Sequence, residues 1–496
     1  MKKKTLKLIC LVLCLCSVLA ILAACKDNGT KDPESTPSDT QPSGDEGGYE
    51  YDENGYVKDT INRTLVDTDI RILMDSSSKN DVMPDEADAT NDVVAMQSYY
   101  RRLELEARLG CTTEIITAPG EYKGMTDFIQ AAEKAGDSGI DLICAFSLVP
   151  PQLAKRGLLT NLNNLQYPEL DMPWWPESIQ EWQHNGALYY VSNNSSNRVV
   201  RAQEVVFADT KMINNKGLDP LEEIVLDGKW TLDLMLTYAK YVTTDMDAAP
   251  EERVYGLAID DQSRADQFFY GAGLEMTKLN ADGEVELTLD DTAVIQKTIS
   301  VIDKLGTIAS YSEFFVDTNN ESKLMTDNRT MFMAGYMNMI TLIDNQSGYI
   351  PLPTPKYDEE QKEYYTTPHN SYDVWCIPVS CKNKEDAGVV IEAIASSDYR
   401  DLAPFFYEEK LKLRYSEDAN GAEIFDLIRN ATHVGFGRIN SESIDILETH
   451  FRRCFYRGGA QTFVSDYATS MNENQKNTYK IKFKTLLISL EKYKDQ

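Results

Sequence analysis

The chain has 496 residues and a mass of 56.0 kDa, long enough for two or three domains, and 42% of its residues are hydrophobic. Lysine and arginine total 49 against 79 aspartates and glutamates, so the net charge is −30 and most of the surface repels polyanions. These values exclude a small disulfide-rich scaffold and argue against nucleic acid as a partner. The 27 tyrosines are more than a packed core needs, which suggests aromatic recognition surfaces.

The chain begins with a targeting segment. Residues 1–7 are basic and residues 8–22 are apolar, as in a secretory signal peptide, and the apolar run is short for a membrane span. The run ends on Leu22-Ala-Ala-Cys25, which resembles a bacterial lipobox. We therefore expect residues 1–24 to be a lipoprotein signal peptide and Cys25 to carry the lipid that anchors the protein at the outer face of the cytoplasmic membrane. The alternatives are an uncleaved anchor helix and an ordinary signal peptide.

Residues 25–62 follow as a polar, mostly acidic stretch that contains no aliphatic residue before Val57. Such a stretch buries too little apolar surface to offset its conformational entropy, so we predict a disordered acidic tether. Downstream of Cys25 the chain has an odd number of cysteines, and this argues against a disulfide framework. They are Cys111, Cys144, Cys376, Cys381 and Cys454.

Beyond residue 62, strand-like runs alternate with helical runs, which predicts an α/β body with mostly parallel sheets. The first runs are predicted strands at 70–74, 113–116 and 141–146 and predicted helices at 91–109, ended by Gly110, and at 123–135.

Polar residues follow two of these predicted strands. Asp75 and Ser76 come after the first strand and Ser147 after the third. Because α/β folds bind ligands at the carboxyl ends of their strands, we expect these side chains to border a ligand cleft. Ser76 has the alternative role of capping the next turn.

Two further strands are predicted at 186–191 and 205–207, joined by a polar segment. This segment holds Asn193, Asn194 and Arg198, which are either ligand-binding residues at a crossing between lobes or parts of an ordinary surface loop. Further predicted elements are a helix from its N-cap Thr231 to about residue 242, a hairpin turn at 281–284, and helices at 444–455 and 463–490.

Several short sequence segments occur along the chain in an order that resembles a known protein family. The landmarks include the lipobox with Cys25, Asp141-Leu-Ile143, Gly157-Leu-Leu159, Pro173-Trp-Trp175, Asp227-Gly-Lys-Trp-Thr231, Met331-Phe-Met-Ala-Gly335, Ile350-Pro-Leu-Pro353 and the segment around Pro404 and Tyr407. Together they are similar to the extracellular solute-binding proteins of family 1, the lipoprotein receptors of ABC sugar importers.

This resemblance implies a fold and a division of the chain. The fold would be a two-lobed, periplasmic-binding-protein-like α/β clamshell whose chain crosses between the lobes about three times. Lobe one would hold residues 63–192 and 368–411, and lobe two residues 193–367 and 412–496. The ligand would lie in the cleft between the lobes.

One departure concerns calcium. Some relatives have an acidic calcium loop at the position of residues 243–252. This chain keeps Asp245 and Asp247 there but lacks the glycine that allows such a loop to turn sharply. We therefore favour an ordinary acidic surface loop over a calcium site. The sequence contains none of the metal-binding and catalytic motifs HExxH, CxxC and GxSxG and no GxxxxGK phosphate loop. We therefore expect no metal, no cofactor and no enzymatic activity.

Sugar binding calls for aromatic faces that cover the C–H side of a ring, together with polar groups that reach hydroxyls. The aromatic candidates are Trp230, Tyr270, Tyr336 and Trp375, and each has the alternative of being a core residue. Asn338 and Asp373 complete the set of candidate ligand-binding residues.

The leading hypothesis is a monomeric, lipid-anchored receptor that binds a sugar or oligosaccharide and delivers it to ABC transporter permease subunits. Two alternatives remain open. One is a surface-anchored polysaccharide hydrolase, and the other is a protein that presents its ligand to a membrane sensor.

Overall fold

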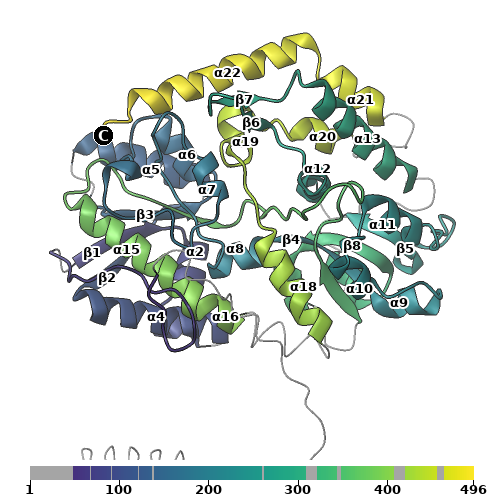
Figure 1. The fold of residues 1–496 in the computed structure, drawn as a ribbon, viewed down its shortest axis with the longest axis horizontal. Helices are drawn as coiled ribbons and strands as arrows, with labels where there is room; N and C mark the ends of the chain where they lie inside the picture. The colour runs from purple at the N-terminus through teal and green to yellow at the C-terminus, as the bar shows by residue number, and fades with distance from the viewer. Residues whose placement is uncertain are drawn as a thin grey trace, which may run out of the picture. The chain divides into compact units, whose positions relative to one another are not determined.

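The computed structural model describes residues 49–496, apart from 67–68, 91, 121, 137–138, 260–261, 309–320, 343–347, 407–418 and 455–462. The predicted signal peptide, Cys25 and most of the predicted tether lie outside the described residues. Residues 50–496 belong to one structural unit, which contains two large sheets and their helices (Figure 1).

The first sheet has the strand order β10-β3-β1-β2. Its strands are β1 (Asp69–Met74), β2 (Thr112–Thr117), β3 (Leu142–Phe146) and β10 (Asp373–Cys376). Strand β1 pairs in parallel with β2 and β3, and β10 pairs antiparallel with β3. The apolar runs of β1, β3 and β10 are buried, as expected of strands covered on both faces. Three of the predicted strands are thereby confirmed.

Helices surround this sheet, among them α4, α5, α6 and α15 (Figure 1). Helix α4 ends at Gly110, whose left-handed backbone confirms the predicted helix end. The helices that precede strand β4 in the chain are α2 (Ser76–Val82), α3 (Glu86–Ala89), α4 (Val93–Leu109), α5 (Tyr122–Ala135), α6 (Val149–Ala154), η1 (Leu162–Asn164), α7 (Ser178–Glu181) and α8 (Asn197–Ala202).

The second sheet has the strand order β5-β8-β4-β9. Its strands are β4 (Glu204–Asp209), β5 (Tyr255–Ile259), β8 (Thr330–Tyr336) and β9 (Tyr349–Leu352). Only β5 and β8 are parallel, while β4 is antiparallel to both β8 and β9. The expectation of mostly parallel sheets is therefore wrong for this sheet. A strand that is buried on both faces has a continuous apolar sequence whether its neighbours are parallel or antiparallel, so the sequence does not distinguish the two arrangements.

The predicted hairpin is confirmed as β6 (Thr277–Leu279) and β7 (Val285–Leu287), and Thr231 caps α11 as predicted. The helices around the second sheet are α9 (Thr210–Asn215), α10 (Leu221–Leu226), α11 (Leu232–Ala239), η2 (Pro250–Glu252), η3 (Gln262–Ala265), α12 (Asp266–Gly271), α13 (Thr292–Ile308), α14 (Glu321–Thr326) and η4 (Met337–Leu342). The remaining helices are α15 (Lys384–Ser397), η5 (Asp398–Leu402), α16 (Ala403–Phe405), α18 (Ala419–Asn430), α19 (Phe436–Ile439), η7 (Ser441–Ile444), α20 (Thr449–Arg453), α21 (Phe463–Ser470) and α22 (Glu473–Lys492).

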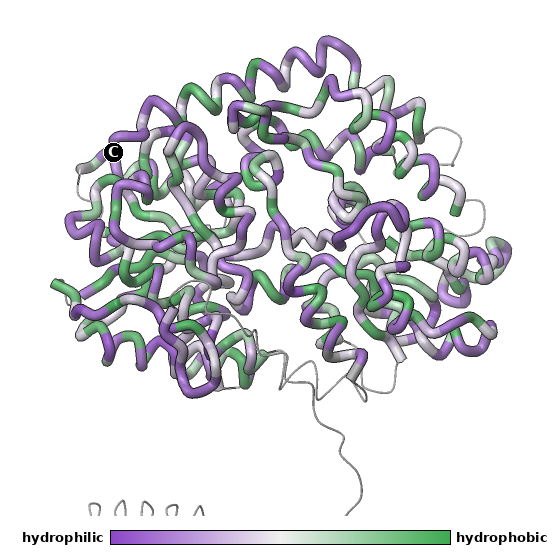
Figure 2. Tube along the Cα trace, in the orientation of Figure 1, coloured by the Kyte–Doolittle hydropathy of each residue, from purple (hydrophilic) through white to green (hydrophobic). Residues whose placement is uncertain are grey.

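Two hydrophobic cores correspond to the two sheets, and we call each core with its sheet the first lobe and the second lobe. The C-terminal part of the chain contributes to both. Phe436 and Leu490 lie in the first core, whereas Phe451 and Tyr479 lie in the second. The expected assignment of all of residues 412–496 to one lobe is therefore wrong. Hydrophilic and hydrophobic residues alternate along α22 (Figure 2), and such an amphipathic helix can bury its apolar face against either sheet.

Three other expectations differ from the structure. Residues 186–191 form only isolated bridges, such as Val191 with Trp375, rather than a regular strand. The predicted helix 444–455 is shorter, with α20 beginning at Thr449, and the predicted helix 463–490 is broken in two at Met471 and Asn472. The Asn472 side chain accepts a hydrogen bond from the Gln475 backbone N–H and begins α22, which a sequence pattern of continuous helix formers conceals.

The end of the expected tether is folded onto the first lobe. Val57 is buried in the first core, and the Asp59 carboxylate accepts hydrogen bonds from Arg108, Arg400 and Ser396. The prediction of disorder up to residue 62 is thus wrong for residues 50–62. Apolar packing of Val57 and Ile61, the ionic contacts of Asp59 and the hydrogen bonds of Thr60 with Tyr167 and Glu169 dock a segment whose overall composition is polar.

All five cysteines downstream of Cys25 are buried free thiols in the structure. Among the helices of the described residues, none combines the length and the apolar character that a membrane crossing requires.

Candidate functional site

A cavity of about 290 Å³ lies between the two lobes. Its wall contains charged, polar and aromatic side chains, which is the composition expected of a ligand site for a polar molecule. The lining residues are Asp75, Ser77, Asp81, Phe146, Arg198, Arg201, Ala202, Arg264, Tyr336, Asn338, His369 and Ser371. We call this space the inter-lobe cavity.

The first lobe contributes the ends of its parallel strands. Strands β1 and β3 run in the same direction, so Asp75 and Phe146 meet at one edge of the sheet. Asp75 is held in place as the N-cap of α2, because its carboxylate accepts hydrogen bonds from the Ser78 backbone N–H at 2.8 Å and from the Ser78 hydroxyl at 2.6 Å. Helix α2 then carries Ser77 and Asp81 into the wall of the cavity.

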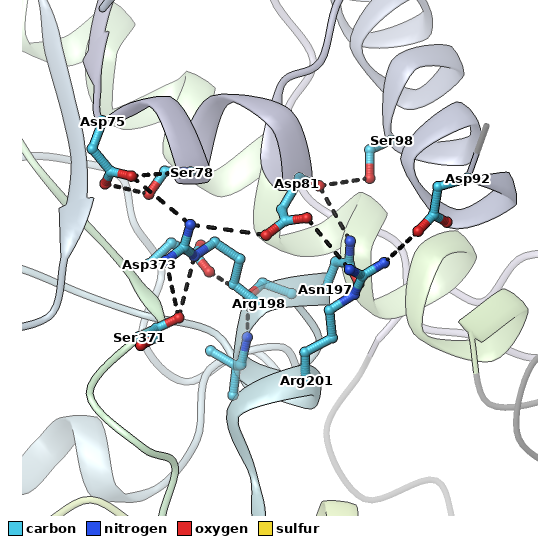
Figure 3. A network of polar contacts seen from close by, with 12 residues as sticks. Asp75, Ser78, Asp81, Asp92, Ser98, Asn197, Arg198, Arg201, Ser371 and Asp373 are labelled. Atoms are coloured by element: carbon cyan, nitrogen blue, oxygen red, sulfur yellow. Dashed lines mark hydrogen bonds and ion pairs between the residues drawn. The ribbon is translucent and has the colours of Figure 1, made fainter. Parts of the chain in front are cut away.

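Helix α8 contributes two arginines. Ser196 caps this short helix, and the Ser196 hydroxyl in turn donates to the Asp373 carboxylate at 2.6 Å. The apolar residues of α8 face the two cores, which leaves Arg198 and Arg201, three residues apart, on the face toward the cavity (Figure 3).

Arg198 has an unusual hydrogen-bonding state. Its Nε and Nη2 atoms donate to the Ser371 carbonyl oxygen at 3.3 and 3.1 Å. Its Nη1 atom is buried and has no hydrogen-bond acceptor, since the nearest carboxylate oxygens, on Asp75 and Asp81, lie 3.9 and 3.8 Å away. The side chain is only 6% exposed, so water does not freely replace the missing acceptor.

Arg201 is held more completely (Figure 3). It donates to Asp92 at 2.8 Å and to the Asn197 side chain at 2.8 Å, and it lies 3.5 Å from an oxygen of Asp81. Burial raises the pKa of Asp81, and the positive charges of Arg201 and Arg198 only partly oppose this shift.

The second lobe provides an aromatic wall at the end of β8. The Arg264 guanidinium lies over the Tyr336 ring, 4.2 Å from the ring centroid, and the His369 ring stacks on Tyr336 with a centroid distance of 6.1 Å. Burial and the charges of nearby arginines, Arg264 first among them, hold the pKa of His369 well below its ordinary value. His369 is therefore neutral at physiological pH.

Four of the residues proposed from the sequence line the inter-lobe cavity: Asp75, Arg198, Tyr336 and Asn338. Three more lie next to its wall without lining it. Ser76 is the exposed first residue of α2, Ser147 donates to the Asn370 carbonyl oxygen at 2.8 Å, and Asp373 is the buried partner of Ser196.

Asn193 and Asn194 lie elsewhere. Asn193 is buried, donates to Asp398 at 3.2 Å and accepts a hydrogen bond from the Ser195 backbone N–H, which is a structural role at the crossing. Asn194 lines a second, larger cavity of about 1090 Å³, whose wall also holds residues of both lobes, such as Trp174 and Tyr364, and which shares no lining residue with the inter-lobe cavity.

Three of the aromatic candidates lie in the cores or in a buried polar network. Trp230 is fully buried, donates from its indole nitrogen to the Pro353 carbonyl oxygen at 2.8 Å and packs on Phe332. Trp375 is buried within β10, and the Tyr270 hydroxyl donates to Glu448 at 3.0 Å. For these three residues the structure supports the alternative of a core position.

Several lining residues were not proposed from the sequence. The spacing of Arg198 and Arg201 in a short helix would have indicated Arg201. Arg264, His369 and Ser371 carry no sequence signal, because they come from a single 3₁₀ turn and from a crossing segment that only the tertiary fold brings to the cavity.

The acidic loop is an ordinary turn in the structure, with the Asp247 backbone N–H donating to the Asp245 carboxylate at 3.0 Å. Within the part of the chain that the structure describes, no three histidine, cysteine, aspartate or glutamate side chains converge as metal ligands would.

Neither the family models nor the curated proteins compared with this chain match its sequence. Solved structures do match its fold. A cyclo/maltodextrin-binding protein complexed with maltotetraose superposes with a TM-score of 0.54 at 13% identity, covering 84% of this chain and 98% of that protein.

Two other solved structures are similar in the same way. The ABC transporter-associated binding protein of B. animalis subsp. lactis Bl-04, in complex with β-1,6-galactobiose, gives a TM-score of 0.51 at 12% identity and covers 83% of this chain and 98% of that protein. The extracellular solute-binding protein of Staphylococcus aureus, in complex with maltose, gives 0.50 at 11% identity, with 86% and 98% covered. The predicted fold class, an α/β fold of the periplasmic solute-binding type, is thereby confirmed.

Proposed function

We propose that this protein is a receptor that binds a carbohydrate in the inter-lobe cavity and delivers it to the permease subunits of an ABC transporter. The observation that carries the proposal is the composition of the cavity wall, where the side chains of Arg198 and Asn338 lie together with the carboxylates of Asp75 and Asp81 and the rings of Phe146 and Tyr336.

The surrounding groups suit a sugar. A hydroxyl group both donates and accepts, and the cavity offers donors on Arg198 and Asn338 beside acceptors on Asp75 and Asp81. Phe146 adds an apolar ring surface. The solved structures with this fold hold maltotetraose, galactobiose and maltose, which supports a saccharide as the ligand class here.

We further propose that the receptor is a lipoprotein, held at the outer face of the membrane by lipidated Cys25, with residues 26–49 as the remaining tether. Cys25→Ala is expected to leave the protein unprocessed or to release it from membranes, because the lipid attaches through that sulfur. Membrane fractionation with mass spectrometry measures this. Normal mature mass in the membrane fraction of the variant would contradict lipidation at Cys25.

The proposal predicts binding without turnover. At ligand a hundredfold above its Kd, linkage stabilises the folded state by about 2.7 kcal/mol, which raises the melting temperature of a protein of this size by several degrees. We therefore expect members of a panel of mono- and oligosaccharides to raise the melting temperature and to be recovered intact by chromatography. Shifts with peptides or amino acids alone would change the ligand class, and cleaved products would favour the hydrolase alternative.

A further inference from the structure

The chain passes from the second lobe to the first directly after helix α18. Ile428 packs in the second core and Val434 in the first, so His433 lies between the two cores. Backbone hydrogen bonds hold this crossing, because the His433 N–H donates to the Thr366 carbonyl oxygen at 2.9 Å and the Thr366 N–H donates to the Ala431 carbonyl oxygen at 2.8 Å. The His433 backbone is therefore fixed at a point where the lobes meet.

One carboxylate from each lobe faces the His433 ring. Glu181 ends α7, which packs in the first core, and Glu275 follows Leu274, which packs in the second. The His433 Nε2 atom lies 3.7 Å from an oxygen of Glu181 and 3.4 Å from an oxygen of Glu275. The imidazole thus bridges the two lobes, and we call these three side chains the His433 bridge.

The charge of His433 decides whether the bridge attracts or repels. A protonated ring attracts both carboxylates, whereas a neutral ring leaves two negative charges that face each other from different lobes. Burial raises the pKa of Glu181, the His433 charge opposes this rise and the Glu275 charge adds to it, so the three groups act on one another. Titratable groups on the neighbouring elements are Tyr365, which meets the imidazole edge-on, and the Arg429–Asp426 pair of α18.

The bridge also links protonation to the arrangement of the lobes. Although burial lowers the pKa of His433, the hydrogen bond with Glu275 and the two negative charges raise that pKa above its ordinary value. Because the proton binds more tightly while both carboxylates lie at the ring, protonation in turn favours the arrangement that holds them there. This effect is complete below the ordinary value of about 6.5 and is lost as the pH rises through the raised value.

The inter-lobe cavity depends on the same arrangement. Its wall takes Asp75 from the end of β1 in the first lobe and Tyr336 from the end of β8 in the second. A saccharide contacts both walls only while the lobes lie as they do in the structure. The apparent affinity of a ligand falls with the fraction of molecules in the competent arrangement, so a contact between the lobes outside the cavity changes binding inside it.

We infer that the His433 bridge is a pH-sensitive contact between the lobes that regulates saccharide binding in the inter-lobe cavity, with tighter binding when His433 is protonated. The inference rests on the proposed function and adds a means of regulation to it. His433 does not line the inter-lobe cavity, so this regulation acts through the positions of the lobes and not through contact with the saccharide.

The first test measures the separation of the lobes in the full chain without any saccharide. Two fluorophores, attached through unnatural amino acids at the exposed residues Glu104 of α4 and Asp303 of α13, report the separation by energy transfer. We expect the transfer efficiency to change between about pH 6 and about pH 8, the range in which His433 loses its proton. His433→Gln is expected to give the same efficiency at both pH values.

The second test measures affinity by calorimetry at the same two pH values. The probes are maltotetraose, maltose, β-1,6-galactobiose and the other saccharides of the panel. We expect those that bind to do so about two- to fivefold more tightly at the lower pH, the range that one partly exposed ion pair provides. Burial raises the pKa of Glu204 to about 8, so Glu204 also titrates near the cavity, and the pH ratio is therefore compared with that of His433→Gln, which should be smaller.

Two further variants assign the effect to the bridge. Glu181→Gln is expected to reduce the response of both measurements to pH, because it removes the carboxylate of the first lobe. Glu177→Gln is the control, because it removes the same charge from an exposed residue just before α7 and should leave both responses as in the wild type.

The outcomes separate the two proposals. Equal transfer efficiencies at both pH values in the wild type, or equal pH ratios of affinity in the wild type and His433→Gln, would overturn the regulation and leave the receptor function standing. Weaker binding at the lower pH, relative to His433→Gln, would overturn it as well. If the transfer efficiency responds through His433 but no saccharide binds, the bridge is confirmed and the proposed function is wrong.

Discussion

At the scale of single residues, the tryptophan side chains show how burial and a hydrogen-bond acceptor distinguish a core residue from a ligand-binding residue. Trp174 and Trp175 both donate to the Glu392 carboxylate, at 3.0 and 3.1 Å, and Trp230 donates to the Pro353 carbonyl oxygen. An indole has a large apolar body and one donor, so it fills a core when a buried acceptor is near. Trp175 and Trp230 are therefore structural residues in the present arrangement, and Trp174, although buried, also lines the larger cavity.

We predict that Trp230→Ala lowers the free energy of unfolding by about 3–5 kcal/mol through the cavity that it leaves, while saccharide affinity at low temperature stays unchanged. Tyr336→Ala, at the cavity wall, is the matched comparison and should weaken binding with a smaller effect on stability. Thermal melts and calorimetry on both variants measure this. Reduced saccharide affinity in a folded Trp230→Ala protein would contradict the core role and indicate that Trp230 contacts the ligand.

His433 makes stability depend on pH. Its Nε2 atom lies 3.4 Å from Glu275 and 3.7 Å from Glu181, and its ring meets Tyr365 edge-on. Burial lowers the pKa of His433, but the hydrogen bond to Glu275 and the charges of both carboxylates outweigh it and raise that pKa above the ordinary value. Protonated His433 therefore stabilises the folded state more than neutral His433 does.

A raised folded-state pKa means that the stabilisation is complete below the unfolded value, about 6.5, and is lost as pH rises through the folded value. We expect the wild type to lose up to about 1 kcal/mol relative to His433→Gln as the pH rises from about 6 to about 8. Melting curves of both proteins across this range give the difference. Parallel pH profiles would show that His433 does not contribute.

At the scale of elements, the segment of residues 50–66 is held on the first lobe by several contacts, among them the buried side chains of Val57 and Leu65 and the ion pair of Arg63 with Asp386. The Asp59 side chain is nearly buried and faces Arg108, Arg400 and Ser396. Burial alone would raise the pKa of Asp59, but these hydrogen bonds and charges lower it below the ordinary value, which marks the carboxylate as a tight ionic anchor.

Asp59→Ala is expected to loosen this segment around residue 59, because two arginines lose their shared acceptor, at a cost of about 1–3 kcal/mol. Limited proteolysis should then cleave between residues 50 and 66 several-fold faster than in the wild type. Glu53→Ala, in the exposed turn of the same segment, serves as the control and should not change the rate. Equal rates for all three proteins would mean that Asp59 does not anchor the segment.

Short sequence patterns predicted individual helices and strands well, but they predicted poorly to which lobe a helix belongs. The strand at 70–74, the end of α4 at Gly110 and the cap at Thr231 follow from short patterns, and the structure has them. The position of α22 does not follow from such patterns. The apolar face of α22 predicts that the helix is buried on one side. It does not predict that Leu486 packs in the first core while Tyr479 packs in the second.

At the scale of the whole molecule, the site combines residues from both lobes and from the segments between them. Asp75 was predictable because it directly follows a parallel strand, and Tyr336 because it lies at a strand end. Arg264 and His369 reach the cavity only through the tertiary fold. The sequence thus predicted lining residues near strand ends and also Arg198, whereas Arg264, His369 and Ser371 line the cavity only because of the tertiary fold.

The central claim is that a saccharide binds at Arg198, in the inter-lobe cavity. Hydrogen–deuterium exchange, with and without the saccharide that raises the melting temperature most, tests it directly. The account predicts slower exchange in residues 75–82, 197–202 and 330–338. Protection confined to residues 173–181 and 423–433, which line the larger cavity, or no protection at all despite binding, would contradict it.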